Sequence, residues 1–271
     1  MAMLINGQPG DSISALDRGL AYGDGVYRTL EWCNGQPRLW RWQYARLAED
    51  AARLCLPVPA EALLLEEMRQ LTQGMERAVI KIVLTRGVGQ RGYAIPEPCQ
   101  PTRMISANPW DGYPAMLAEH GVTVRWCQLR LASQPLLAGI KHLNRLENVL
   151  ARSEWHDPAI REGLLCDQDG RVIEATMSNL YVLKDGVLLT PPLHQCGVRG
   201  ALRDWLFDCA PVLGVALEEA ELRAGDVLAA DALLLSNSLM GIWPVAQLDA
   251  RVWRDFTVAQ RLRQYWLAET A

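Results

Sequence analysis

Short apolar runs separated by turn residues predict strands in both halves of the chain. Hairpin turn signals stand at Asn34-Gly35, Asp169-Gly170 and Asp185-Gly186. The expected strands cover residues 4–6, 78–84, 102–107, 122–131 and 232–235, with two more between residues 163 and 181.

Longer stretches repeat apolar residues every three to four positions, which is typical of helices that pack on one side. The expected helices cover residues 40–54, 60–73, 143–155, 201–213 and 257–268. Gly74 follows the second of these and predicts its end. The third carries Leu143, Leu146, Val149 and Leu150 on one face.

Two prolines and a glycine in residues 108–114 break every regular pattern, so a domain boundary is expected there. The sequence then divides into an N-terminal domain over residues 1–108, a linker over 109–115 and a C-terminal domain over 116–271. At 271 residues the chain is long enough for two such domains.

Composition narrows the classes of function. Half of the residues are hydrophobic, 21% are charged and the net charge is −4, which argues against binding to nucleic acid or to an anionic membrane. Neither a signal peptide nor an apolar run long enough to cross a bilayer is expected. The seven cysteines are scattered and form no C-x-x-C pair. They favour reduced thiols in a cytoplasm, with neither disulfides nor a metal site.

The chain has only three lysines, and one of them stands in an unusual setting. Lys184 lies beside a hairpin turn, and Lys81 lies in an alternating run that points its amine off the sheet. Lys141 follows the apolar stretch 135–140 and directly precedes a helical pattern. A desolvated amine there would have a lowered pKa and could attack a carbonyl compound, whereas a lone lysine before a helix is more often a surface charge.

The segment G-I-K-H-L-N-R-L-E-N-V-L-A-R, residues 139–152, resembles the lysine segment of the fold type IV pyridoxal-phosphate enzymes. The resemblance implies that Lys141 holds pyridoxal 5'-phosphate. It also implies an α/β (α+β) fold with a smaller N-terminal α/β domain, a larger C-terminal barrel-like domain, and the cofactor in the cleft between them. Enzymes of this family are usually homodimers.

Three further segments of the first half are similar to motifs of the same family. Residues 17–27 resemble D-R-G-x-x-x-G-D-G-x-[YF], which implies that Tyr27 and, two positions on, Thr29 face the substrate. Arg46 stands where the family has the phosphate-binding arginine of H-x-x-R-L, although Gln43 replaces the histidine. The loop at 85–93 resembles T-R-G-x-x-x-R and makes Arg91, with Tyr93 beside it, the expected carboxylate-binding residue.

The second half completes the resemblance. Residues 174–179 are close to E-x-x-x-[SA]-N, whose glutamate bonds the pyridine nitrogen, so Glu174 takes that role by resemblance. A glycine-containing loop opens the predicted helix at residue 201, and its phosphate-binding amides correspond to Val198 and Arg199. The family places a phosphate-binding hydroxyl at Ser238, and Asn237 could contact substrate.

Three functions are compatible with this pattern. Residues 141–147 and Asn237 are most similar to the lyase branch, which forms p-aminobenzoate and pyruvate from 4-amino-4-deoxychorismate. In that branch Lys141 is the catalytic amine, and Thr29 could assist as a proton donor. D-amino-acid and branched-chain aminotransferases share the lysine, the glutamate and the phosphate site, and the loop around Arg91 does not separate them from the lyases. A catalytically inactive binding protein is the third alternative, which the set of Lys141, Glu174 and Arg46 opposes.

Overall fold

The computed structural model describes residues 2–269, which fall into two compact units. The first unit runs as far as Asp111 and also contains Lys141–Asn144. The second contains Gly112–Ile140 and the chain from Arg145 onward. The break near residue 111 lies inside the linker expected at 109–115. The sequence put Lys141 in the second domain, whereas its segment groups with the first unit because it is hydrogen-bonded there.

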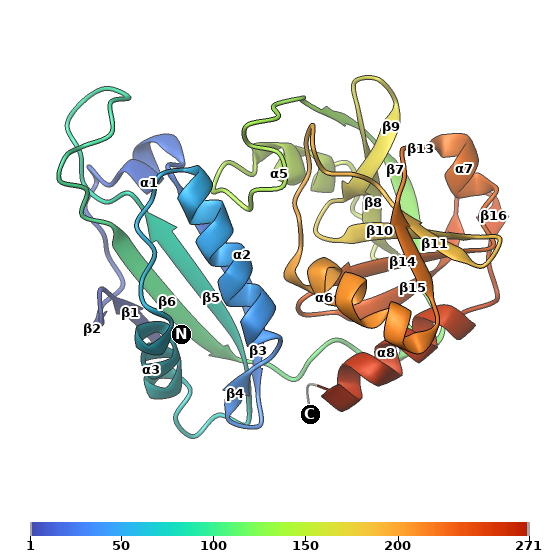
Figure 1. Ribbon diagram of the computed structural model, residues 1–271, viewed down its shortest axis with the longest axis horizontal. Coiled ribbons are helices and arrows are strands. Elements are labelled where there is room, and N and C mark those ends of the chain that lie inside the picture. The colour runs from blue at the N-terminus through green and yellow to red at the C-terminus, as the bar shows by residue number, and fades with distance from the viewer. Residues whose placement is uncertain (1, 270–271) are drawn as a thin grey trace. The chain divides into compact units, whose positions relative to one another are not determined.

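The first unit is built on a six-stranded antiparallel sheet in the order β2-β1-β6-β5-β3-β4 (Figure 1). The strands are β1 Ala2–Ile5, β2 Gln8–Pro9, β3 Gly25–Cys33, β4 Gln36–Pro37, β5 Arg77–Thr85 and β6 Thr102–Pro109. The helices are α1 Arg18–Tyr22, α2 Trp40–Arg53 and α3 Glu61–Leu71. The hairpin expected at Asn34-Gly35 joins β3 to β4, with both residues at positive φ.

Strand β3 has two different faces because its side chains alternate. Arg28 and Leu30 are buried, and Arg28 reaches two residues of α2. Tyr27 and Thr29 lie on the opposite face and are partly exposed. The strand therefore presents the ring of Tyr27 and the hydroxyl of Thr29 on the face that α2 does not cover.

The second unit is built on a ten-stranded mixed sheet in the order β12-β11-β10-β14-β15-β7-β8-β9-β13, with β16 paired to β15. Three pairs are parallel, namely β11 with β12, β15 with β7, and β7 with β8. The strands are β7 Val122–Leu131, β8 Ile160–Asp167, β9 Arg171–Ala175, β10 Asn179–Lys184, β11 Val187–Thr190, β12 Ala216–Glu219, β13 Leu222–Arg223, β14 Ala232–Asn237, β15 Gly241–Leu248 and β16 Arg251–Val252. The helices are α4 Met116–Glu119, α5 Leu146–Arg152, α6 Ala201–Cys209, the 3-10 helix η1 Pro211–Leu213, α7 Ala224–Leu228 and α8 Thr257–Glu269.

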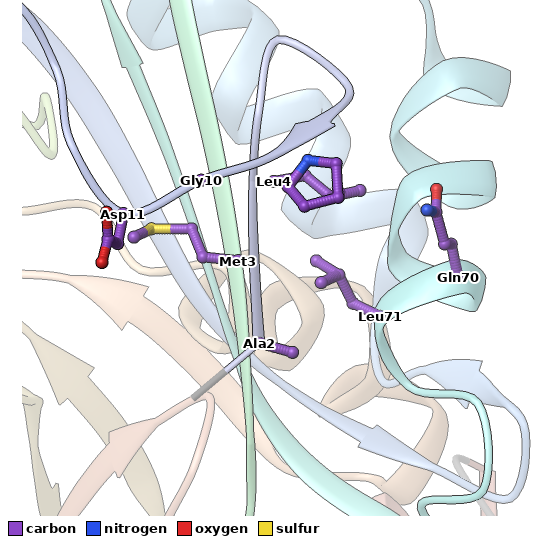
Figure 2. Close-up of a pocket in the computed structure, with 8 residues that line it drawn as sticks. Ala2, Met3, Leu4, Gly10, Asp11, Gln70 and Leu71 are labelled. Atoms are coloured by element: carbon purple, nitrogen blue, oxygen red, sulfur yellow. The ribbon is translucent and has the colours of Figure 1, made fainter.

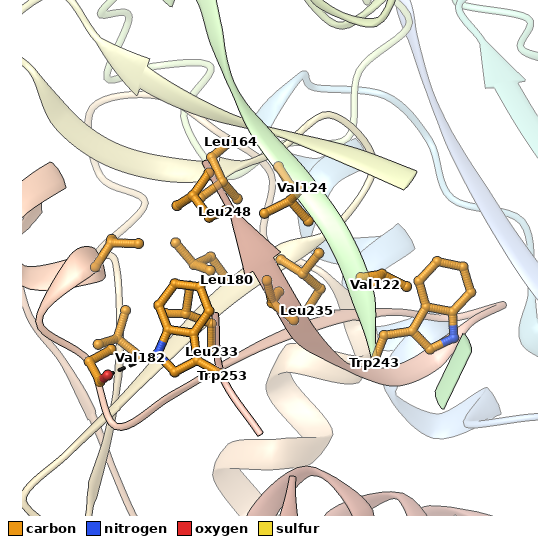
Figure 3. Packing of buried hydrophobic residues seen from close by; sticks show 14 of the residues in the cluster. Val122, Val124, Leu164, Leu180, Val182, Leu233, Leu235, Trp243, Leu248 and Trp253 are labelled. Carbon is orange, nitrogen blue, oxygen red and sulfur yellow. Dashed lines mark hydrogen bonds between the residues drawn. The ribbon is translucent and has the colours of Figure 1, made fainter. Parts of the chain in front are cut away.

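The core of the second unit lies where its central strands bring their apolar side chains together (Figure 3). Members drawn there include Val124 of β7, Leu180 of β10, Leu235 of β14 and Trp243 of β15. Removing such side chains from water stabilises the fold by about 25 cal/mol for each Å² of apolar surface. This core fixes the strand ends from which several candidate site residues project.

Two helices differ from their predicted lengths for identifiable reasons. Helix α5 was expected over 143–155 but begins at Leu146, because His142 pairs with Val26 and the Leu143 N–H donates to the Gly25 carbonyl. Helix α6 was expected to reach residue 213 but ends at Cys209, two residues before a proline that cannot continue the hydrogen-bond ladder.

The mixture of strands and helices confirms the predicted α/β class. Among the helices of the described residues, none combines the length and the apolar character that crossing a bilayer requires.

Candidate functional site

The peptide of Lys141 is held from both sides in the first unit. Its N–H donates to Asp50 Oδ2 at 2.9 Å, and its carbonyl accepts the N–H of Tyr27 at 3.0 Å. The Lys141 Nζ lies 4.6 Å from the centre of the Tyr27 ring. The predicted lysine and the predicted tyrosine are therefore brought together, with the backbone of the lysine fixed at both ends.

A second lysine shares this tyrosine. Lys81 on β5 is paired with Thr29 of β3, and its Nζ lies 5.3 Å from the Tyr27 ring. Both cations can interact with the negative face of the ring. The amine of Lys81 does point off the sheet, but on the same face as Tyr27 and Thr29. Only the register of β3 against β5 reveals this, and the sequence does not supply that register.

Arg46 is buried on α2, and two carboxylates hold its guanidinium. Nη1 lies 2.6 Å from Glu49 Oε2 and Nη2 lies 2.8 Å from Asp50 Oδ1. Asp50 is 0% exposed and also pairs with Arg28. Asp50 was absent from the predicted site. The spacing of Arg46 and Asp50, four residues apart on one helix, is the only signal in the sequence that could have pointed to it.

The loop that carries Arg91 and Tyr93 is held at its base. The guanidinium of Arg18 donates to the carbonyls of Gly92 and Tyr93, at 2.9 and 3.3 Å. The rings of Tyr22 and Tyr93 lie 5.4 Å apart. Arg91 is exposed and the Tyr93 side chain is 85% exposed. The backbone beside these two predicted substrate contacts is therefore held by Arg18, while their side chains face solvent.

Asp24, which directly precedes β3, binds the arginine that holds this loop. Its Oδ2 accepts hydrogen bonds at 2.8 Å from both Arg18 and Arg86. Burial alone would raise the pKa of Asp24. The hydrogen bonds and positive charges of Arg86 and Arg18 together have the larger effect, so the pKa lies below the usual 3.8. Arg86, which was not assigned to the site, thus has a structural role.

In the second unit, Glu174 meets the loop predicted to bind a phosphate. Glu174 is 4% exposed, and its Oε2 accepts the N–H of Val198 at 2.8 Å. The N–H of Arg199 donates to the Gly139 carbonyl at 2.9 Å. Both predicted phosphate-binding amides therefore have acceptors within the chain, and their role toward a phosphate stays a prediction.

Gly197 permits this close approach. It has a φ of +87°, and a Cβ there would stand 2.8 Å from the side chains of Ile173 and Leu193. The Gly139 N–H also donates to the Gly197 carbonyl at 2.9 Å. In the sequence, Gly139 is followed by Ile140 and Lys141.

A buried carboxylate that the sequence analysis did not single out shapes the turn after Glu174. Glu162 on β8 is 0% exposed and accepts from the hydroxyls of Thr176 and Ser178 and from the N–H of Met177. The next residue, Asn179, donates to the Val198 carbonyl at 2.8 Å. Glu162 thereby links the turn to the loop at 197–200.

Asn237 and Ser238 follow the last buried residues of β14. The Asn237 side chain accepts the N–H groups of Leu239 and Met240, each at 2.9 Å, and donates to the Met177 carbonyl at 3.1 Å. The amide of Asn237 therefore organises its own turn. Ser238 is partly exposed in the same turn, and the substrate and phosphate roles predicted for this pair stay predictions.

An open hollow of about 590 Å³ lies away from all of these residues, on the first unit (Figure 2). Met3 and Leu4 of β1, Gln70 and Leu71 of α3, and Asp11 are among its lining residues. None of the predicted site residues lines it, so we do not assign it to the candidate site.

The candidate site thus consists of two sets. The lysine set in the first unit comprises Tyr27, Thr29, Arg46, Asp50, Lys81 and Lys141, and the glutamate set in the second comprises Glu174, Val198, Arg199, Asn237 and Ser238. The lysine set offers a primary amine and a guanidinium, which suit an electrophilic carbon and an anionic group. The glutamate set offers a buried carboxylate and a hydroxyl, which suit a basic ring nitrogen and a polar group.

Comparison with known proteins shows which family and which relatives this chain resembles. A family model described as amino-transferase class IV matches residues 25–248. An aminodeoxychorismate lyase of Vibrio harveyi is 34% identical over 246 residues, which cover 91% of this chain and 91% of the relative. A putative branched-chain-amino-acid aminotransferase of Methanocaldococcus jannaschii is 32% identical over 263 residues, covering 93% and 89%.

A solved structure extends this likeness to the fold. The crystal structure of 4-amino-4-deoxychorismate lyase from Pseudomonas aeruginosa is 42% identical to this chain, with a TM-score of 0.94 and coverage of 98% of both chains.

Proposed function

The chain belongs to the class IV aminotransferase family, and we propose that within it the protein is a pyridoxal-phosphate-dependent lyase that converts 4-amino-4-deoxychorismate to p-aminobenzoate and pyruvate. The likeness to the solved lyase structure over nearly the whole chain carries this choice. The segment at residues 141–147 supports it, because this segment is most similar to that of the lyase branch.

The chemistry of both sets fits pyridoxal 5'-phosphate. Lys141 would bond to the cofactor aldehyde, and the carboxylate of Glu174, which also accepts the Val198 N–H, would bond the ring nitrogen. Arg46, Ser238 and the loop at 197–200 would hold the phosphate. The positive φ of Gly197, which no larger residue could adopt without a clash, keeps that loop against Glu174.

When bound, pyridoxal phosphate supplies an electron sink for a carbanion. Glu174 would keep a proton at the ring nitrogen, which strengthens that sink. The Lys141 amine would take the proton from C4 of the substrate. Loss of that proton would let the C3–O bond break, and the departing enolpyruvate would gain a proton to become pyruvate while the ring becomes aromatic. Thr29, on the face that carries Tyr27, would donate or position a proton for the leaving group.

Two carboxylates of the substrate need cations. Arg91 and Tyr93 are the carboxylate-binding residues we infer for this role, and Asn237 would add a polar contact. Their exposure in the single chain favours a site completed by a second copy.

A homodimer in the cytoplasm is the assembly we infer. Leu146, Val149 and Leu150 of α5 are 74%, 60% and 58% exposed, and Leu136, which precedes them in the chain, is 80% exposed. A cluster of large apolar side chains is costly to leave in water and is typical of a surface that binds a partner. The free cysteines suit a reducing compartment.

An aminotransferase remains the second candidate, because a relative of that description matches the chain at similar identity. It would use the same lysine and glutamate but return the amino group to a keto acid.

The deciding experiment measures products. The cofactor-loaded protein is incubated with 4-amino-4-deoxychorismate, and p-aminobenzoate and pyruvate are quantified. Equal amounts of both support the lyase. Amino-group exchange between D-alanine and 2-oxoglutarate without p-aminobenzoate would identify an aminotransferase instead.

The role of Lys141 is tested in the same preparation. A visible cofactor band that borohydride abolishes should be present in the parent protein and in Lys184→Ala, and absent in Lys141→Ala. A band that survives in Lys141→Ala would contradict the assignment of the lysine.

A further inference from the structure

We propose that Asp50 is a positioning residue that fixes the peptide of Lys141 and the guanidinium of Arg46 at the same time, and thereby sets how tightly the cofactor is retained. The inference deepens the proposed function and rests on it, since it assumes that Lys141 and Arg46 bind the same cofactor.

Each carboxylate oxygen of Asp50 serves a different part of the site. Oδ2 accepts the Lys141 N–H at 2.9 Å and also pairs with Arg28, while Oδ1 accepts Arg46 Nη2 at 2.8 Å. The side chain is 0% exposed, so water does not compete for these bonds. Hydrogen bonds to an ionised group in such surroundings are stronger than neutral ones.

Arg28 makes this arrangement rigid. Its side chain comes from β3, is 2% exposed, and donates to the Arg46 carbonyl at 3.1 Å as well as to Asp50. The strand that carries Tyr27 and the helix that carries Arg46 are therefore locked through one carboxylate. The Lys141 carbonyl is held by Tyr27 of the same strand, which completes the support of the lysine.

An asparagine could not replace Asp50. All three groups that point at the carboxylate are N–H donors, and an amide would oppose one of them with a further donor. Either Arg46 or the pair formed by Arg28 and Lys141 would lose its acceptor. If Asp50 were only part of a structural ion pair, its substitution would lower the stability of the fold and leave cofactor binding unchanged. If it is a positioning residue, its substitution must also weaken cofactor binding.

Glu49 provides a matched control. It pairs with the same Arg46, at 2.6 Å, from the same helix, but its side chain is 50% exposed. Glu49→Gln should alter the charge around Arg46 while leaving the peptide of Lys141 in place.

The test compares cofactor affinity in three apoproteins, by titration with pyridoxal phosphate and detection of the visible band. We expect the dissociation constant to rise by about tenfold or more in Asp50→Asn, the effect of losing one charge-assisted hydrogen bond, and to stay within about twofold in Glu49→Gln. Equal affinities in all three proteins would overturn the proposal, as would equal losses in both variants.

Amide hydrogen exchange of the unmodified apoprotein covers the case in which Asp50→Asn fails to fold. The Lys141 amide, although in a loop, should exchange at least about a hundredfold more slowly than an exposed amide, because a buried carboxylate accepts it. Fast exchange there would overturn the proposal whatever the enzyme catalyses. If the parent protein binds the cofactor and forms no p-aminobenzoate, the proposed lyase function is wrong. The cofactor dissociation constants and the exchange rate of the Lys141 amide still test the role of Asp50 in that case.

Discussion

At the scale of single residues, the buried cysteines are kept as thiols by their surroundings. Burial raises the pKa of both Cys127 and Cys196 to about 12, and neighbouring carboxylates add to the effect. Cys196 directly precedes the glycine that lets the loop close against Glu174. A thiol with such a pKa is almost entirely protonated at neutral pH and reacts slowly with electrophiles.

Alkylation of the native protein at pH 8 should therefore be selective. Cys55, which is exposed, should react first with iodoacetamide, and Cys127 and Cys196 should react only after unfolding. Peptide mass spectrometry before and after addition of urea measures this. Rapid labelling of Cys196 in the folded protein would show that its loop opens to solvent.

The residues of the site differ in how far the sequence could reveal them. Lys141 stood out because lysine is rare in this chain and because its segment resembles a family motif. Asp50 and Glu162 did not, because a buried carboxylate is recognised by the donors around it, and those donors come from distant parts of the chain. Arg46 was predicted as a site residue, but the two carboxylates that hold its guanidinium were not singled out.

At the scale of elements, the turn between β9 and β10 depends on Glu162. Glu162→Gln would set an amide NH₂ against the N–H of either Met177 or Gly163, which can only donate, so at least one buried hydrogen bond would be lost. We expect the free energy of unfolding to fall by about 2 kcal/mol. Urea denaturation measures it, with the exposed neighbour Arg161→Gln as the control, which should change stability by less than about 0.5 kcal/mol.

The connection of Asp24 to Arg18 and Arg86 should make stability depend on pH. Because the pKa of Asp24 is lower in the folded than in the unfolded chain, its stabilising effect is complete above the usual 3.8 and is lost as the pH falls through the folded value. Asp24→Asn should thus lower the free energy of unfolding at pH 7 by about 2 kcal/mol.

The pH profile provides the check on that prediction. The difference between Asp24→Asn and the parent protein should shrink when urea denaturation is repeated near pH 3. Asp11→Asn, at an exposed position, should follow the parent at both pH values. A difference that stays constant with pH would mean that the charge of Asp24 does not stabilise the fold.

At the scale of the whole molecule, the five strands that periodicity gave definite bounds lie within two residues of their observed ends, and Val122–Leu131 was predicted without error. Short elements such as α4, α7 and β12–β13 were not predicted, because two to five residues carry too little periodicity. The extended backbone at 142–143 was missed because pairing with β3, a long-range contact, overrides the helical pattern of its sequence.

The exposed apolar face of α5 leads to a prediction about assembly. If the proposed homodimer uses this face, Leu146→Glu combined with Val149→Glu should shift the protein from dimer to monomer, since a charge buried in an apolar interface is costly. Sedimentation velocity measures the change, and Lys184→Glu, on an exposed hairpin, serves as the control. A parent protein that sediments as a monomer would contradict the homodimer.

The turn held by Glu162 also shows where this enzyme can be redesigned. Thr176 and Ser178 must keep their hydroxyls to satisfy the carboxylate, but Met177 between them is held only through its backbone, by Glu162 and by Asn237. Its side chain is 45% exposed. Position 177 is therefore a place where different side chains can be displayed on a backbone that its neighbours hold fixed.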